Sequence, residues 1–346
     1  MSSPWVESLK HSVEVDIHKV PYAYPLRTAA ILAVSVAAQV ATGHISFLIP
    51  SSVAILFIGL LDAPDPLRTR FHVWLRSSFA FTVAVLGAVF VASDPVLRVI
   101  ATGAVAALCG YVGIIGTRCA VGGLLTLVLF TVFAGTPEYG FTMVETPLAV
   151  LGGCFFYGFF AFVTTPLMHM RRRIPIFTPL PWRSALFTWH GINDGFVRHA
   201  IRLSVVIMIG TVLAEVLDFP HAYWIPMTVA WVSKPDFNGT VNKVVYRVLG
   251  TLLGLAVVST VFTVFPNQVS LESAMVVLGC LIVCMMIWIN YSYSTTGITI
   301  FVISLFSIEH DPLSDTVPWR IVSTLIAGVL VAAAAYIWPT RPPSVN

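Results

Sequence analysis

The chain alternates between long apolar stretches and short polar turns from residue 26 to residue 338. A helix of roughly 20 apolar residues crosses the hydrocarbon core of a bilayer, so each stretch predicts a transmembrane helix. The pattern predicts an all-α integral membrane protein with about 12 transmembrane helices. They are expected near residues 26–43, 45–61, 74–92, 96–116, 119–134, 146–167, 199–218, 222–233, 244–265, 271–289, 293–308 and 318–338.

The segment before the first span has a helical stripe of its own. Trp5, Leu9, Val13 and Ile17 are spaced four residues apart, which places them on one face of a helix. Residues 1–24 are therefore predicted to form a cytoplasmic amphipathic segment. The stripe fits a helix that lies on the membrane surface, and it equally fits a helix that packs against the spans.

Lysine and arginine are distributed unevenly across the predicted membrane. With the N-terminus inside, 17 of the 19 fall on the cytoplasmic side, and Arg98 and Arg320 fall outside. Cytoplasmic loops of membrane proteins carry such an excess of positive residues. The distribution predicts a multi-pass protein of the inner (plasma) membrane with both termini in the cytoplasm.

The chain also repeats one pattern in its two halves. An arginine opens a span, a proline interrupts the next one, and a Pro-Asp pair is followed by an arginine eleven residues after the aspartate. Six spans per half is an even number, so the two halves form a parallel repeat with one orientation. The matched positions are Arg27, Pro50, Pro64-Asp65 and Arg76 in the first half, and Arg202, Pro226, Pro235-Asp236 and Arg247 in the second.

The repeat sets the expected organisation of the chain. Small residues line the helix after the Pro-Asp pair in both halves, which favours close helix packing and allows a homodimer. The predicted parts are the N-terminal segment 1–24, a first six-helix repeat 25–167, a cytoplasmic linker 168–197, a second six-helix repeat 198–338 and a cytoplasmic tail 339–346.

Composition excludes several classes of protein. Hydrophobic residues make up 57% of the chain and charged residues 10%, whereas soluble domains carry about 25% charged residues. The net charge of +3 follows the sidedness of the loops and indicates no nucleic-acid partner. The five cysteines lie in apolar runs without a CxxC pair, so no metal, cofactor or disulfide is expected. The chain has no P-loop motif, and no clustered catalytic groups indicate an enzyme.

The second half carries the most specific motif. It consists of Tyr223-Trp224-Ile225-Pro226, then Pro235-Asp236, then the run 246–254 with glycine at 250 and 254. This motif is similar to that of the fusaric acid resistance protein family, and the resemblance extends more weakly over the first half. Members resemble exporters of aromatic carboxylic acids, and the plant aluminium-activated malate channels look like distant relatives. The resemblance implies transport of organic anions, with no chemistry on the substrate.

The interrupted spans are candidates for a binding site. Corresponding short or proline-broken segments often mark the substrate site of transporters with internal repeats. If helices begin at Pro50 and Pro226, their N-termini point free N–H groups and positive dipole ends at the interior, which suits an anion. Ordinary tilted helices with a proline kink are the alternative. The side chains that would contact the substrate there are Ser51, Ser52, Tyr223, Trp224 and Thr228.

Several basic positions are also candidates. If Arg27, Arg76, Arg202 and Arg247 face the interface between halves, they form a basic funnel for anions. The alternative is that they extend to lipid phosphates and only fix the topology. Arg118 lies between two apolar runs with almost no polar loop, and its counterpart in the second half is Tyr293. These two residues are further candidates for substrate contacts.

Proton coupling is the last sequence-based hypothesis. Glu215 and Asp218 are acidic residues at the end of a span, and Glu215 matches Gln39 of the first half. His44 and His221 lie beside the two broken helices. The sequence thus predicts a secondary, proton-driven exporter of aromatic or other organic acids. A passive organic-anion channel and a non-transporting membrane subunit are the alternatives. The expected partners are the anion and membrane lipids, and no feature of the sequence supports a periplasmic adaptor.

Overall fold

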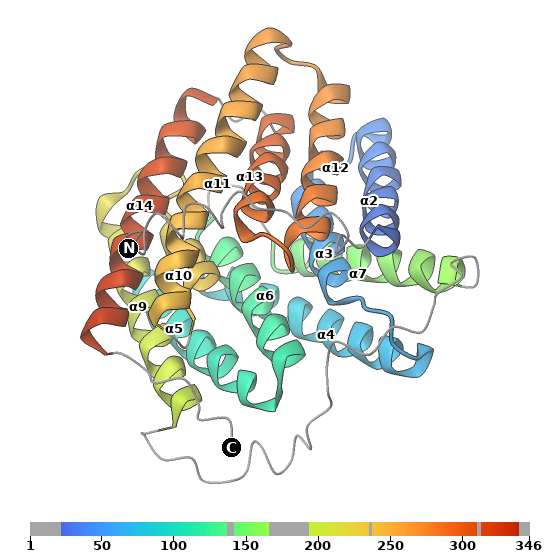
Figure 1. Ribbon diagram of the computed structural model, residues 1–346. Helices are drawn as coiled ribbons and strands as arrows, with labels where there is room; N and C mark the ends of the chain where they lie inside the picture. The colour runs from blue at the N-terminus through green and yellow to red at the C-terminus, as the bar shows by residue number, and fades with distance from the viewer. Residues whose placement is uncertain (1–21, 137–141, 166–193, 235–236, 310–312, 339–346) are drawn as a thin grey trace, which may run out of the picture. The chain divides into compact units, whose positions relative to one another are not determined.

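The computed structural model describes residues 22–136, 142–165, 194–234, 237–309 and 313–338. All regular secondary structure in these ranges is helical, which confirms the predicted all-α fold. Each predicted span corresponds to one helix (Figure 1). The helices are α2 Ala23–Thr42, α3 Leu48–Leu61, α4 Leu67–Val91, α5 Pro95–Val112, α6 Thr117–Ala134, α7 Glu145–Thr164, α9 Gly195–Leu217, α10 Trp224–Val232, α11 Phe237–Val264, α12 Val269–Met286, α13 Tyr291–Ile308 and α14 Leu313–Ile337.

Ten of the helices in the described ranges are long and apolar enough to cross a membrane. The protein is therefore a multi-pass membrane protein. Most of the N-terminal segment and of the linker, and the whole of the tail, lie outside the described residues.

The two remaining helices are the predicted short ones. α3 has 14 residues and α10 has 9, so they are about 21 Å and about 14 Å long, against about 30 Å of hydrocarbon. Pro50 and Pro226 are each the third residue of their helix. Proline is tolerated in the first turn of a helix because those N–H groups have no partner within the helix. The proline-broken short helices are confirmed, and each begins two residues before its proline.

The described chain divides into two compact units, and neither follows one sequence half. Of the described residues, unit 1 contains those within 22–78, 145–165 and 245–321, and unit 2 contains those within 79–144, 194–244 and 322–338. Unit 1 takes α2, α3 and α7 from the first half with α12 and α13 from the second. Unit 2 takes α9 and α10 from the second half with α5 and α6 from the first. The unit boundaries fall inside α4, α11 and α14.

In unit 1, α12 packs against both α13 and α2, and α3 packs against α7 (Figure 1). The backbones of α12 and α13 touch, because a Cβ on Gly279 would lie 2.8 Å from the carbonyl oxygen of Gly297. Small residues permit such close approach of membrane helices. α13 is the most buried of the spanning helices in the described residues.

In unit 2, α5 packs against α9 and α6, and α10 packs against the same two helices. Small residues again determine how closely the helices approach each other. A Cβ on Gly110 of α5 would lie 3.0 Å from the Cα of Ala200 in α9, and one on Gly103 would lie 2.5 Å from the side chain of Met208. Both units are thus held together by close contacts at glycines.

Candidate anion-binding sites

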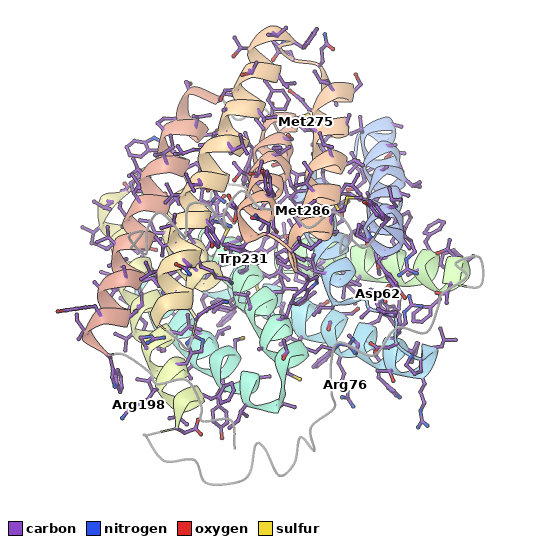
Figure 2. All side chains as sticks on the ribbon, in the orientation of Figure 1. Asp62, Arg76, Arg198, Trp231, Met275 and Met286 are labelled. Atoms are coloured by element: carbon purple, nitrogen blue, oxygen red, sulfur yellow. The ribbon has the colours of Figure 1, made fainter. Side chains whose placement is uncertain are left out.

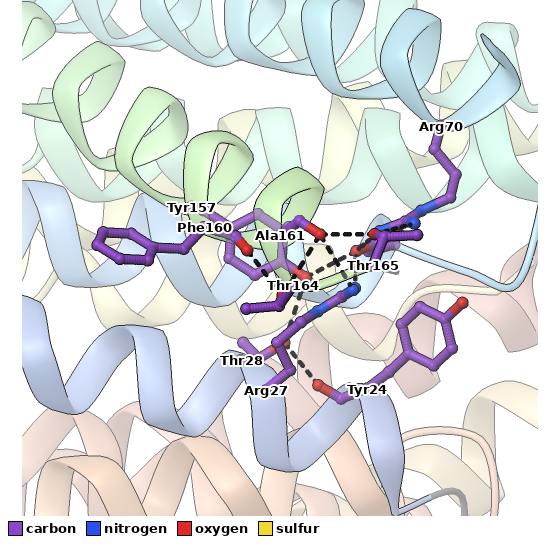
Figure 3. A network of polar contacts seen from close by, with 10 residues as sticks. Tyr24, Arg27, Thr28, Arg70, Tyr157, Phe160, Ala161, Thr164 and Thr165 are labelled. Carbon is purple, nitrogen blue, oxygen red and sulfur yellow. Dashed lines mark hydrogen bonds and ion pairs between the residues drawn. The ribbon is translucent and has the colours of Figure 1, made fainter. Parts of the chain in front are cut away.

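A buried ion cluster in unit 1 joins three helices to the residue that follows α3. Asp62, labelled in Figure 2, accepts hydrogen bonds from Arg27 of α2, Arg70 of α4 and Tyr157 of α7, which are labelled in Figure 3. Arg70 is bidentate, with Nε 2.8 Å from Oδ1 and Nη2 2.9 Å from Oδ2. The Tyr157 hydroxyl lies 2.9 Å from Oδ2, and the Asp62 side chain is only 8% exposed. Such charge-assisted bonds are the strong ones in proteins.

Neutral and aromatic groups complete this cluster. Arg70 also donates to the Thr165 hydroxyl at 2.8 Å, and Arg27 donates to the carbonyl oxygen of Ala161 at 3.4 Å. The Tyr24 ring lies 4.7 Å from the Arg27 guanidinium carbon and 5.8 Å from that of Arg70. Arginine stacks favourably on aromatic rings. The cluster therefore offers both charge and aromatic surface.

Arg202 of α9 holds the corresponding place in unit 2. It donates to the carbonyl oxygen of Lys234, just after α10, and to that of Trp338, just after α14, at 3.0 Å. Arg27 likewise contacts the residue after α3 and the last turns of α7. Both arginines are buried and fasten helix ends together.

Arg247 of α11, in unit 1, is different. Its side chain is 0% exposed, and none of its three guanidinium nitrogens has a hydrogen-bond partner among the described residues. Buried charges in proteins are normally paired or hydrogen-bonded, because an unpaired one is costly. The nitrogens of this guanidinium therefore have unused capacity to donate hydrogen bonds.

Buried hydroxyl groups are frequent where α11 meets the start of α13. Gly250, one turn further along α11, lies against Ser292 and Thr295 at the start of α13. Arg247 precedes Gly250 by three residues, and each residue of a helix adds a rise of about 1.5 Å. Arg247 is therefore level with the first turn of α13. The hydroxyls of Thr251 and Thr295 are buried without a hydrogen-bond partner in the described part of unit 1. The Ser294 hydroxyl, on the same turn of α13, is also buried without a hydrogen-bond partner among the described residues.

Each of the two short helices also carries a buried hydroxyl without a hydrogen-bond partner among the described residues. Ser52 and Thr228 are each two residues after the proline, each is 0% exposed, and neither hydroxyl has a hydrogen-bond partner among the described residues. Ser51 is already engaged, since it donates to the carbonyl oxygen of Phe47 at 2.7 Å and accepts from Gln39 at 3.0 Å. Of the two predicted serines, Ser52 is the one with free hydrogen-bonding capacity.

The aromatic pair before α10 is packed within unit 2. Tyr223 and Trp224 are buried, and the Trp224 ring stacks on His221 with centroids 4.5 Å apart. His221 adopts a left-handed φ of 60° and lies 3.5 Å from the Tyr223 hydroxyl. These rings form one aromatic group at the start of α10.

The remaining predicted substrate contacts are less enclosed. Arg76 is exposed (Figure 2), unlike its predicted counterparts Arg27, Arg202 and Arg247, which are each buried. Arg118 is half-buried at the start of α6, after a short turn that uses a φ of 142° at Gly116. Tyr293 is half-buried in the first turn of α13, where its N–H bonds to the side chain of Asn290 at 3.4 Å.

The predicted proton-coupling residues differ in their surroundings. Glu215 makes an ion pair with Arg98 of α5, at 2.8 Å between Oε1 and Nη1. Asp218 and His44 are exposed, and Asp218 ends α9 with a left-handed φ of 42°. The arginine at 98 supplies a structural reason for the charge at 215.

Sequence reasoning missed several residues of these sites. Asp62 and Arg70 are 8 residues apart, whereas Tyr157 is 95 residues from Asp62 and only folding brings it to them. A signal was present for Asp62, which is an acidic residue directly at the end of a short apolar helix. Glu272 was also missed as a candidate. It is 5% exposed and accepts a hydrogen bond from Ser307 at 2.8 Å.

Comparison with known proteins supports the resemblance for the second half. Residues 207–334 match the sequence profile of the fusaric acid resistance protein-like family. The chain is 32% identical over 159 residues to an uncharacterized protein, ORF2, of Neisseria gonorrhoeae. It is 33% identical over 150 residues to the inner membrane protein YccS of Escherichia coli. These regions cover 44% and 42% of this chain, but only 38% and 20% of the two relatives. No solved structure matches the chain.

Proposed function

Because the second half matches the fusaric acid resistance protein-like family, we propose that this membrane protein exports organic anions, with aromatic carboxylates as the main class. We place it in the inner membrane, where the similar YccS protein is found, with both termini in the cytoplasm. The proposed ligand is an anion, and the protein makes no covalent change to it.

The observation that carries this proposal is the buried Arg247. An unpaired buried charge costs several kcal/mol, a large part of the 5–15 kcal/mol that typically separates folded from unfolded protein. No described residue offsets this cost with a hydrogen bond to the guanidinium. A bound carboxylate would offset it through two parallel N–H···O bonds.

The hydroxyls near Arg247 fit the same ligand. A carboxylate has two oxygens and about four acceptor sites, so it can bind hydroxyl donors as well as a guanidinium. Thr251 and Thr295 have such donors to offer. The N-terminal end of α13, where Asn290 caps the N–H groups of Ser292 and Tyr293, adds a partial positive charge at the same level. All these groups favour negative charge.

Two sources of energy can drive such export. A membrane potential supplies about 2.3 kcal/mol per elementary charge per 100 mV, which corresponds to roughly 50-fold outward accumulation of a monovalent anion. Proton coupling, our sequence-based hypothesis, would add the energy of the pH gradient. In a passive anion channel, which is the alternative mechanism, the membrane potential is the only one of these two energy sources that acts.

The test is a flux assay with the full chain in liposomes. We expect efflux of labelled benzoate, faster when the potential is negative inside. Acceleration by a pH gradient at zero potential supports the proton-driven exporter, and a rate that responds to the potential alone supports the channel. Absence of benzoate flux under every gradient contradicts the proposal.

The repeat provides a matched control for Arg247. Arg247→Gln is expected to reduce benzoate flux about 10- to 100-fold, because one desolvated contact to a carboxylate is worth about 1.5–3 kcal/mol. Arg76→Gln removes an arginine at the matching position of the first half, but that side chain is exposed. It is expected to transport at nearly the wild-type rate. Equal loss in both variants contradicts a special role for Arg247.

A further inference from the structure

Unit 1 contains a second arrangement that suits a carboxylate, and there one of the protein's own carboxylates occupies the position. Two guanidinium groups and one phenol hydroxyl converge on the side chain of Asp62, and Figure 3 labels the residues that supply them, Arg27, Arg70 and Tyr157. One of its two oxygens, Oδ2, accepts hydrogen bonds from all three residues, Arg27, Arg70 and Tyr157. These donors are of the kind that proteins use to bind carboxylate ligands.

Aromatic rings flank the same position. The Tyr24 ring lies beside both guanidinium groups, and the Phe162 ring lies 5.7 Å from the guanidinium carbon of Arg70. An aromatic carboxylate would satisfy both features, with its carboxylate between the arginines and its ring against Tyr24 or Phe162. Aspartate satisfies only the first.

We propose that Asp62 is a built-in competitor that occupies the carboxylate position of a second anion site in unit 1. A transported aromatic carboxylate displaces it and takes over the bonds to Arg27 and Arg70. This inference rests on the proposed function and adds to it the residue that competes with the substrate.

The position of Asp62 in the chain allows it to leave. It follows the last residue of α3 in an extended conformation, with φ −77° and ψ 126°, and the next helix begins at Leu67. The Asp62 N–H stays bonded to the carbonyl oxygen of Ile58 at the end of α3, so its side chain can rotate away without unwinding a helix, whereas Arg27 and Arg70 remain on α2 and α4.

Comparison of the two halves separates this role from simple fastening of helix ends. Ser233 stands where the first half has Asp62, two residues before the matched proline. Arg202 nevertheless holds the corresponding helix ends together through the carbonyl oxygens of Lys234 and Trp338. An aspartate at this position is thus not a general requirement of the repeat.

The test is equilibrium binding of benzoate to the purified full chain, measured by calorimetry. Asp62→Asn keeps the shape of the side chain and removes its charge. If Asp62 leaves the arginines free in only about a tenth of the molecules, the substitution lowers the benzoate Kd about tenfold. Glu272→Gln is the matched control, since it neutralises another buried carboxylate of unit 1 whose partner is a serine. It is expected to leave the Kd unchanged.

Two further measurements keep the outcome clear. Repeating the Asp62→Asn comparison in an Arg247→Gln background isolates this site from the first one. If Asp62→Asn fails to fold, Tyr157→Phe removes one donor from Asp62 and retains both arginines, and it should lower the Kd two- to fivefold.

An unchanged or higher Kd in folded Asp62→Asn, or in Tyr157→Phe where the first does not fold, overturns the inference. If the wild-type protein binds benzoate and these variants bind it no more tightly, only this inference fails. If the wild-type protein neither binds nor transports benzoate, the proposed function itself fails.

Discussion

The contact between α11 and α13 brings Arg247 to the level of the start of α13, and the glycines at 250 and 254 decide how close the two helices come. A Cβ on Gly250 would overlap the carbonyl oxygen of Ser292 and lie 2.7 Å from the Cβ of Thr295. Carbon atoms pack best at about 3.5–4.0 Å, so the helices would have to separate by about 1 Å. Neither obstacle can rotate away, because one is backbone and the other is the branch point of a side chain.

Gly250→Ala is therefore expected to destabilise the protein by about 1–3 kcal/mol, the usual cost of overpacking. Gly152→Ala is the matched control in the same unit, since a Cβ there meets nothing within 4 Å. Thermal unfolding in detergent should show a lower Tm for Gly250→Ala and a Tm at or above that of the wild type for Gly152→Ala. Benzoate binding should weaken only in Gly250→Ala. Equal Tm values for the two variants would show that α11 and α13 do not meet at this glycine.

Two other predictions concern unit 2. Arg98→Gln and Glu215→Gln should each lower stability, and the loss in the double variant should be smaller than the sum of the two single losses. Because Glu215 is 24% exposed, we expect a coupling energy of roughly 0.5–1 kcal/mol between the two residues. Additive losses in a double-mutant cycle would disprove the ion pair. Thr228→Val should retain or raise the Tm, because it replaces a buried hydroxyl without a hydrogen bond by a methyl group. A loss of several °C would reveal that this hydroxyl has a structural partner.

Much of the fold followed from local sequence. Apolar length predicted the spanning helices, and the positions of Pro50 and Pro226 predicted the short ones, because proline is tolerated in a first helical turn and disfavoured further inside. The lack of a polar loop around Arg118 was also visible in the sequence, and the structure has a short connection there, in which Gly116 supplies a backbone conformation that other residues avoid. These features depend on residues close together in the chain.

The candidate sites depended on tertiary contacts, so the sequence predicted them only in part. Arg76 and Arg247 are matched positions of the predicted repeat, yet one is exposed and the other is buried. The difference arises because glycines bring α11 against α13, and a pattern along a single helix does not reveal its neighbours. Asp62 and Tyr157 are 95 residues apart, and no local spacing links them.

The most direct test of the account is a structure determined in the presence of 4-bromobenzoate, whose bromine can be located by anomalous scattering. The account predicts a carboxylate within hydrogen-bonding distance of the Arg247 guanidinium, with the hydroxyls of Thr251 and Thr295 nearby. A guanidinium already paired with one of the protein's own carboxylates, with no bromine signal in unit 1, would contradict it.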